Sequence, residues 1–331
     1  MTSGAGAGAV DRLIGASRCL IRESVVEKLL GMRAEICAFN ADHGLRTALW
    51  YGAEWFLQWH EGTAAAVEQA WRRARRDRLQ AGREVIHRSR GPAGLVDALH
   101  LCTAHNRDTP KDIEARIRRV GREHELGWSA DPSQIWQRLS APCLVDRVDA
   151  LAAVTRDNVV AVTSEFTESV DLVKAIAQHY HAAVTYQRFA DGDLRNGDIG
   201  AAYVDVEEAS HVTRVQALSK RALGNSMVRV SLQYVQCVVL LLGARPDPAA
   251  RLAVTLAELL SGMPVRPAVR LVGPCRDACE EAARALAAVP GIDLQVREIA
   301  ARGAARVLAV LEEVGVIRRA TPPALPCPIP I

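Results

Sequence analysis

The stretch Asn158 to Phe189, NVVAVTSEFTESVDLVKAIAQHYHAAVTYQRF, has the pattern of a strand, a helix and a second strand. Val159 to Thr163 is short, apolar and rich in β-branched residues, as expected for a strand buried on both faces. Ser164 or Thr167 can cap the following helix, and Ala182 to Tyr186 returns to a β pattern. Two strands joined through a helix are most simply parallel, with a right-handed crossover. The stretch therefore predicts an α/β fold.

The residues after this unit continue the alternation of strand and helix. Gly224, Gly262 and the Asp247-Pro248 pair supply stop and start signals for helices. Over residues 155–318 we expect a mostly parallel sheet with covering helices. The expected strands are 201–206, one within 227–242, 269–272 and 292–296, and the expected helices are 207–223, 247–260, 275–288 and 300–314.

The first half of the chain is predicted to be helical. Residues 1–9 have the composition of a flexible leader, and residues 10–154 are expected to form a helical, arginine-rich region. Apolar residues recur at helical spacing over 10–30 and over 45–59. Thr109-Pro110 and Asp131-Pro132 are start signals for two further helices. We therefore expect helices first and the sheet afterwards.

Composition places the chain among ordinary globular proteins. Of 331 residues, 49% are hydrophobic and 24% charged, which is not the balance of a disordered chain. The longest apolar run, Cys237 to Leu242, is far shorter than the roughly 20 residues needed to span a bilayer. The eight cysteines are scattered, and no secretory signal is evident at the N-terminus. These features favour an intracellular, cytoplasmic protein with reduced thiols and no membrane partner.

Basic residues are concentrated in one segment. Trp71 to Arg90 contains eight arginines against two acidic residues. On a helix such arginines would suit the phosphates of nucleic acid or an acidic partner. A solvated face with internal ion pairs, or a subunit contact, explains the same pattern and stays open. The candidate nucleic-acid-binding residues are Arg72, Arg73, Arg75, Arg76 and Arg83.

A second candidate site follows from the architecture expected for the second half. In α/β folds, ligands bind at the carboxyl ends of parallel strands, where helix N-termini present free amides to anions. Gly273-Pro274 is also typical of a plain turn into a helix, and this is the favoured interpretation of that pair. The candidate ligand-binding residues at these strand ends are Thr163, Ser164, Thr167, Gly273 and Cys275.

Motifs for catalysis, metals or cofactors are not evident. Neither a nucleophile elbow nor a Walker lysine is present, and no dinucleotide glycine motif follows a strand. His100, Cys102 and His105 match no standard zinc spacing, and Cys275 with Cys279 would supply only half a site. We therefore predict no metal and no cofactor, and the sequence leaves open whether the protein is an enzyme.

The C-terminal segment 319–331 is proline-rich and is expected to be extended, lying along its own domain or along a neighbouring subunit of a homo-oligomer. A disordered end is the alternative that the sequence leaves open. The first functional hypothesis is a non-catalytic binding or assembly protein that contacts nucleic acid through the arginine-rich helix. The alternative is an enzyme or sensor that binds a phosphorylated small molecule at the strand ends. An assembly subunit without a ligand is a third hypothesis.

Overall fold

A computed structural model of the chain describes residues 8–105, 108–140, 155–163, 166–193, 199–208, 211–225, 228, 231–232, 235–263, 265–299 and 309. The first half contains five helices and five strands within these ranges. The helices are α1 (Val25–Gly31), α2 (Arg33–His43), α3 (Ala64–Arg76), α4 (Pro110–Glu125) and α5 (Pro132–Ser140). The strands are β1 (Val10–Cys19), β2 (Arg46–Gly52), β3 (Trp55–Gly62), β4 (Gln80–Gly91) and β5 (Leu99–His105).

The second half contains seven strands and three α-helices within the described residues. The strands are β6 (Thr155–Thr163), β7 (Val184–Asp191), β8 (Ile199–Glu208), β9 (His211–Ser219), β10 (Cys237–Leu241), β11 (Ala268–Gly273) and β12 (Leu294–Glu298). The helices are α6 (Phe166–His179), α8 (Pro246–Ser261) and α9 (Arg276–Leu286), and the 3-10 helix η2 spans Lys220–Gly224.

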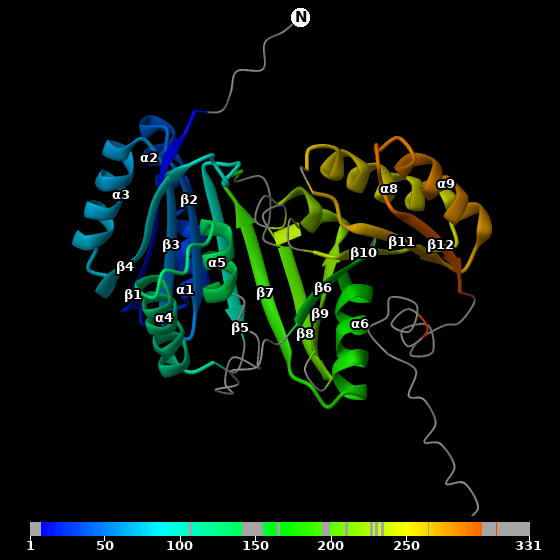
Figure 1. The fold of residues 1–331 in the computed structure, drawn as a ribbon, viewed down its shortest axis with the longest axis horizontal. Helices are drawn as coiled ribbons and strands as arrows, with labels where there is room; N and C mark the ends of the chain where they lie inside the picture. Colours follow the sequence, from blue (N-terminus) through cyan, green and yellow to red (C-terminus); the bar gives the residue numbers. More distant parts are fainter. Residues whose placement is uncertain are drawn as a thin grey trace, which may run out of the picture.

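All of these strands belong to one sheet, which runs through the molecule from β4 to β12 (Figure 1). Its order is β12-β11-β10-β6-β9-β8-β7-β5-β2-β3-β1-β4. The prediction of a mostly parallel sheet is wrong, because the sheet is mixed. Parallel pairing is confined to β2 with β5 and to the group β9, β6, β10, β11 and β12.

The predicted helical N-terminal region is also wrong, because the chain begins with strands. Residues 10–19 form β1, and the predicted helix over 45–59 is the hairpin of β2 and β3. The chain reverses at Ala53 and Glu54, which both have positive φ angles (44° and 62°) without being glycine. The starts of α4 and α5 at Pro110 and Pro132 agree with the predicted signals. The helices predicted over β1 and over the hairpin are wrong for one reason. Each segment contains a run of consecutive buried residues, five in β1 and all of β3, so neither shows the alternation of a half-exposed strand.

The unit from β6 to β7 agrees with the predicted order of strand, helix and strand. The two strands run in the same direction, but β9 and β8 lie between them in the sheet. The expected helix over 207–223 is wrong, because His211–Ser219 is strand β9. Helices α8 and α9 and strands β10, β11 and β12 lie where the sequence predicts them. The expected helix over 300–314 and the tail 319–331 fall outside the described residues, apart from residue 309.

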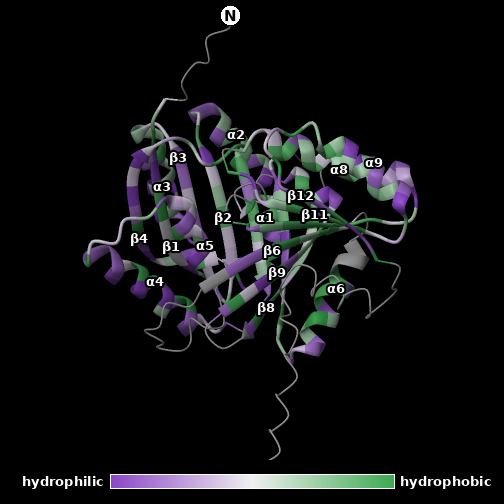
Figure 2. Cartoon of the chain, turned by 45° about the vertical axis from the view of Figure 1, so that its right-hand side comes forward, coloured by the Kyte–Doolittle hydropathy of each residue, from purple (hydrophilic) through white to green (hydrophobic). Residues whose placement is uncertain are grey.

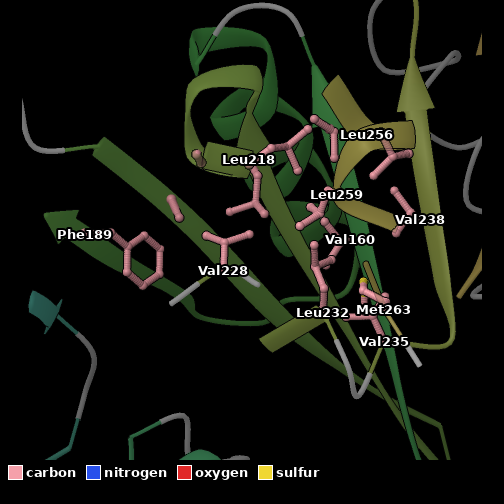
Figure 3. Packing of buried hydrophobic residues seen from close by; sticks show 14 of the residues in the cluster. Val160, Phe189, Leu218, Val228, Leu232, Val235, Val238, Leu256, Leu259 and Met263 are labelled. Atoms are coloured by element: carbon pink, nitrogen blue, oxygen red, sulfur yellow. The ribbon is translucent and has the colours of Figure 1, made fainter. Parts of the chain in front are cut away.

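Helices cover both faces of the sheet. One face packs against α1, α2 and α3 in the first half and against α6 in the second. The other face packs against α4, α5, α8 and α9, and its core is continuous across the two halves. Figure 3 shows part of that core, where Val160, Leu218, Val238 and Leu256 pack together. Hydrophilic and hydrophobic residues alternate along α4 and α6, as expected for helices with one buried side (Figure 2).

No helix in the described part of the chain combines the length and apolar character needed to cross a membrane.

A close contact between β1 and α3 leads to the first testable prediction. Trp71 of α3 is 4% exposed, and its ring would lie 2.5 Å from a Cβ atom added at Gly15 of β1. Gly15→Ala must therefore displace the ring, and we expect it to lower the free energy of unfolding by about 1–3 kcal/mol. Gly121→Ala in α4 is the control, because an added Cβ meets nothing within 4 Å there. That change should instead add about 0.5–1 kcal/mol. Urea denaturation of both variants measures the difference, and equal effects would contradict the packing described.

Candidate ligand pocket between α2 and α3

A cavity of about 420 Å³ lies between helices α2 and α3 on the face of the sheet that these helices cover. This size is within the range of about 300–1,000 Å³ that is typical of pockets for small molecules. Its floor is formed by β2, β3 and β5, and its walls by the two helices. The cavity is thus framed by regular elements rather than by loops alone.

Most of the wall surface is apolar. Ile36 and Phe39 project from α2, and Leu49, Phe56 and Leu99 project from the strands of the floor. The α3 wall is built from alanines, Ala70 and Ala74, which lie one helical turn apart. Small residues on one wall and aromatic rings on the others leave a space suited to a flat apolar group.

Polar side chains cross the floor in a connected row. Asn40 Nδ2 donates to Ala98 O (2.7 Å), and Asn40 Oδ1 lies 3.5 Å from Thr47 Oγ1. Thr47 Oγ1 lies 3.0 Å from His60 Nδ1, and His60 Nε2 lies 3.3 Å from Gln58 Oε1. Gln58 Nε2 donates to Gln80 Oε1 (2.6 Å). All of these residues except Gln80 are buried, so the row brings polar atoms beneath an apolar cavity.

The row continues to the end of α3. Gln80 Oε1 also accepts from Ser17 Oγ (2.7 Å), and Gln80 Nε2 donates to Asp77 Oδ2 (3.2 Å). Asp77 Oδ1 accepts from the backbone amide of Leu79 (2.9 Å). The row therefore joins α2, four strands and the end of α3 in one network, and such networks hold their members in defined positions when they are satisfied.

His60 is the titratable centre of this row. Burial lowers the pKa of its imidazole to about 4, so the ring is neutral at physiological pH. A neutral imidazole has one donor nitrogen and one acceptor nitrogen. Gln58 Nε2 donates to Gln80, so Gln58 Oε1 faces His60 Nε2 and accepts its proton. Nδ1 is then the acceptor nitrogen and takes the hydroxyl proton of Thr47.

Charged residues surround the mouth of the pocket. Arg73 of α3 donates to Glu35 of α2, and its guanidinium lies 4.7 Å from the centre of the Phe39 ring. Gln69 Nε2 lies 2.9 Å from His43 Nε2, which adds a second link between the helices. Arg76 also lines the cavity, and its guanidinium has no ion pair within the described part of the chain. One arginine is therefore available to an anionic group at the mouth.

Local sequence signals place α2 and α3 around the cavity. Gly44 ends α2 in a left-handed conformation (φ 60°), which allows the chain to turn directly into β2. Thr63 begins α3, and its hydroxyl accepts from the amide of Ala66 (3.2 Å). Arg33 at the start of α2 is buried and donates to the carbonyl of Asp193 beyond β7. The helix that forms one wall is thus attached to the second half of the chain.

The five arginines predicted for nucleic acid have different surroundings. Arg72 pairs with Glu68 (3.1 Å), Arg73 pairs with Glu35, and Arg75 and Arg76 are exposed at the end of α3. The expected helix over 71–90 ends at Arg76, so Arg83 lies on strand β4. Its guanidinium donates to the carbonyls of Ala74, Asp77 and Gln80, and it therefore closes the end of α3. Arg73 and Arg76 line the cavity between α2 and α3.

The strand-end residues of the second half form a different environment. Thr163 and Gly273 lie at the carboxyl ends of β6 and β11, on the same edge of the sheet, as predicted. A Cβ added at Gly273 would lie 2.8 Å from Cys279 Sγ and 3.2 Å from Leu242, so its side is filled by protein. Cys275 precedes α9 without a side-chain capping bond. Ser164 lies outside the described residues, and only the backbone of Thr167 is described, in the first turn of α6.

The floor of the pocket is not evident from the sequence alone. Phe56, Gln58 and His60 occupy alternate positions of β3 and therefore share one face. The available signal was two polar residues, Gln and His, at every second position after Phe56. Leu57 and Trp59 between them are also buried and apolar, so the sequence shows no simple polar and apolar alternation. Within the described residues, no group of three His, Cys, Asp or Glu lies close enough to hold a metal ion.

No protein-family model and no curated protein matches the chain. Among solved structures, BlsA in its photo-activated state is 18% identical over 40% of this chain and 91% of its own, with a TM-score of 0.28. BlrB, a BLUF protein in its dark state, is 18% identical over 35% and 84%, with a TM-score of 0.25. A bacterial light-regulated adenylyl cyclase is 10% identical over 68% and 83%, with a TM-score of 0.26. TM-scores this low assign the chain to no family.

Proposed function

We propose that residues 8–105 form a binding module for a flat heteroaromatic molecule that carries an acidic tail. The observation that carries the proposal is the hydrogen-bonded row of polar side chains from Asn40 to Asp77, buried from Asn40 to Gln58, on the floor of an otherwise apolar cavity. Apolar walls suit the faces of fused rings, and the amide of Gln58 suits a ring edge with hydrogen-bonding groups. Arg76 at the mouth suits a phosphate or carboxylate on the tail.

A second observation favours a sensor over a passive carrier. Helix α2 lines the cavity through Ile36 and Phe39, and it also contacts the turn after β7 in the second half. Cys37 Sγ lies 3.6 Å from the carbonyl oxygen of Gly192, beside the contact of Arg33 with Asp193. A ligand that repositions α2 would therefore change contacts made by the second half. Hydrogen exchange at residues 190–193, measured with and without ligand, reports such a change.

Thermal-shift screening tests the binding proposal. The probes are riboflavin 5′-phosphate, GMP and AMP, each beside its unphosphorylated parent. Because a ligand stabilises the folded state according to its affinity, we expect the phosphorylated flat heterocycles to raise the melting temperature more than their parents. If none of these compounds stabilises the protein, the proposal fails.

Two arginines of α3 provide a matched pair of variants. Arg76→Ala removes the guanidinium that lines the cavity, and we expect it to weaken binding of a phosphorylated probe about tenfold without affecting the parent compound. Arg72→Ala is the control, because Arg72 is exposed on the same helix and does not line the cavity. Calorimetric titration measures both. Equal losses in the two variants would contradict the assigned role of Arg76.

Nucleic-acid binding through α3 remains a second proposal, supported by the exposed Arg72, Arg75 and Arg76 at the end of the helix. Basic residues there also complement the helix dipole, which explains them without a partner. Oligonucleotide binding should weaken equally in Arg72→Ala and Arg76→Ala and should fall steeply with salt. Filter binding of both variants thus separates the two proposals. Self-association through segment 319–331 is likewise a proposal, to be tested by the mass of the chain in solution.

A further inference from the structure

A second, smaller cavity of about 70 Å³ lies in the second half, on the face of β7, β8 and β9 opposite α6. Helix α5 covers it through Trp136 and Gln137. The strands contribute Gln187 from β7, Tyr203 from β8 and Gln216 from β9. The apolar side includes Phe189, Val160 and Val235, which are labelled in Figure 3. This cavity shares no lining residue with the pocket between α2 and α3.

The charges at this cavity are balanced within the protein. Arg214 lines it and forms a two-bond ion pair with Asp205, with both N–O distances at 2.7 Å. The side chains of this pair are 7% and 2% exposed. The guanidinium lies 3.9 Å from the centre of the Tyr203 ring, and burial raises the pKa of Tyr203, so its hydroxyl stays protonated. A buried cavity without net charge favours a neutral ligand, since burying a further charge is costly.

Two glutamine amides give the cavity a hydrogen-bonding pattern. Gln216 Nε2 donates to Gln187 Oε1 (3.3 Å). The bond leaves the Gln187 amide with a donor and the Gln216 amide with an acceptor, and within the described residues neither atom has another partner. If both amides are turned over, the roles exchange but the donor and acceptor remain. Side by side, the remaining donor and the remaining acceptor match a ligand edge that carries a C=O group beside an N–H group.

We propose that this cavity binds a neutral, single-ring compound with a lactam or cyclic-urea edge, of the size of a pyrimidine base. One buried water needs about 10–15 Å³ on the same scale, so the cavity has room for roughly five waters. That room limits the ligand to about one ring. The lactam C=O accepts from one glutamine amide and its N–H donates to the other, while the ring lies among Phe189, Trp136 and Val160.

A depression on the surface adjoins the cavity. A shallow depression shares Gln137, Asn158 and Val235 with the cavity and is bordered by Arg138 and Arg266. The shared residues place the depression next to the cavity, at the C-terminal part of α5. A ring that enters here would pass Gln137 before it reaches the paired glutamines.

A pair of ring compounds of equal size tests the proposal without altering the protein. 2-Pyrrolidinone has the lactam edge, whereas γ-butyrolactone replaces its N–H with an oxygen. Calorimetry on the full chain should show binding of uracil and 2-pyrrolidinone, with the lactone at least tenfold weaker because it cannot donate. Lactone binding as strong as lactam binding would overturn the proposal. So would the absence of any binding of uracil and 2-pyrrolidinone at about 10 mM, the affinity range expected for ligands this small.

Glutamine variants locate the site. Gln187→Met and Gln216→Met keep the length of the side chain and remove its hydrogen-bonding groups, so each should weaken uracil binding at least tenfold. Gln295→Met, at an exposed position on β12, is the control for a glutamine-to-methionine change. Circular dichroism identifies any variant that does not fold, and the comparison of lactam with lactone then decides the proposal. Undiminished binding in both folded variants would refute the assigned site.

Discussion

We expect Asp205→Ala to lower the free energy of unfolding by about 3–5 kcal/mol, the range measured when one partner of a buried ion pair is removed. Asp205 and Arg214 face each other across β8 and β9 and are joined by two hydrogen bonds of 2.7 Å. Loss of the carboxylate removes the charge that offsets the cost of burying the Arg214 guanidinium, whose side chain is 7% exposed. Urea denaturation measures the effect, with an unchanged m-value as evidence that the denatured state is the same.

A double variant separates the cost of the unpaired charge from the value of the pair itself. Asp205→Leu combined with Arg214→Met removes both charges and keeps the volume apolar, so most of the lost stability should return. Glu280→Ala is the surface control, because its ion pair with Arg276 is largely exposed and should contribute less than about 1 kcal/mol. An effect of Asp205→Ala no larger than that of Glu280→Ala would show that the Asp205 site is solvated.

The second large effect is expected with acid. Burial lowers the pKa of His60 and of His100 to about 4, whereas an unfolded histidine titrates near 6.5. The unfolded chain therefore binds two protons between pH 6.5 and pH 4 that the folded chain does not bind. The stability these residues support is complete above pH 6.5 and falls as the pH is lowered toward 4. Each histidine contributes a slope of about 1.4 kcal/mol per pH unit, or nearly 3 kcal/mol per pH unit together.

Two further groups change the slope of the unfolding free energy against pH. His87 adds to it, because burial and the neighbouring His124 lower the pKa of His87 as well. Glu61 opposes it, because burial raises the pKa of that carboxyl group and the folded state then binds a proton more tightly than the unfolded state. Denaturation curves collected from pH 7.5 to pH 4 for the wild type, His60→Gln and His100→Asn measure the individual contributions. The exposed His179→Gln is the control, and a wild-type slope that neither buried variant reduces would contradict the assignment.

Local sequence signals were sufficient where an element is bounded by strong start and stop residues. Pro246 to Ser261 and Pro110 to Glu125 are helices in the structure because proline at the start and an amphipathic face are properties of a short window. The strands Cys237–Leu241 and Ala268–Gly273 are continuous apolar runs that lie between such helices.

The same signals failed where burial on both faces removed the alternation of strands. Apolar residues from Leu45 to Trp59 recur at helical spacing, yet this segment contains strands β2 and β3. Helices cover both faces of the hairpin, so its buried residues do not alternate with exposed ones. The turn at Ala53 and Glu54 contains neither glycine nor asparagine, so the usual marker of a hairpin is missing. The sequence of His211 to Ser219 favours a helix for a related reason. Val212, Val215 and Leu218 are spaced three residues apart, as on one side of a helix, but a strand buried on both faces allows apolar residues at the same positions.

By itself, the sequence determined the alternation of strand and helix from β6 to β7 and from β10 to β12, because those choices depend on neighbours within one helical turn or one strand pleat. Only the tertiary structure decided which strands pair, since pairing is settled by contacts between residues far apart in the chain. Thr47 meets His60 and Gln58 meets Gln80 through that pairing. Gln187 likewise meets Gln216 only because β8 lies between their strands and leaves both side chains on one face. Both candidate sites are therefore products of strand order, which no short stretch of residues encodes.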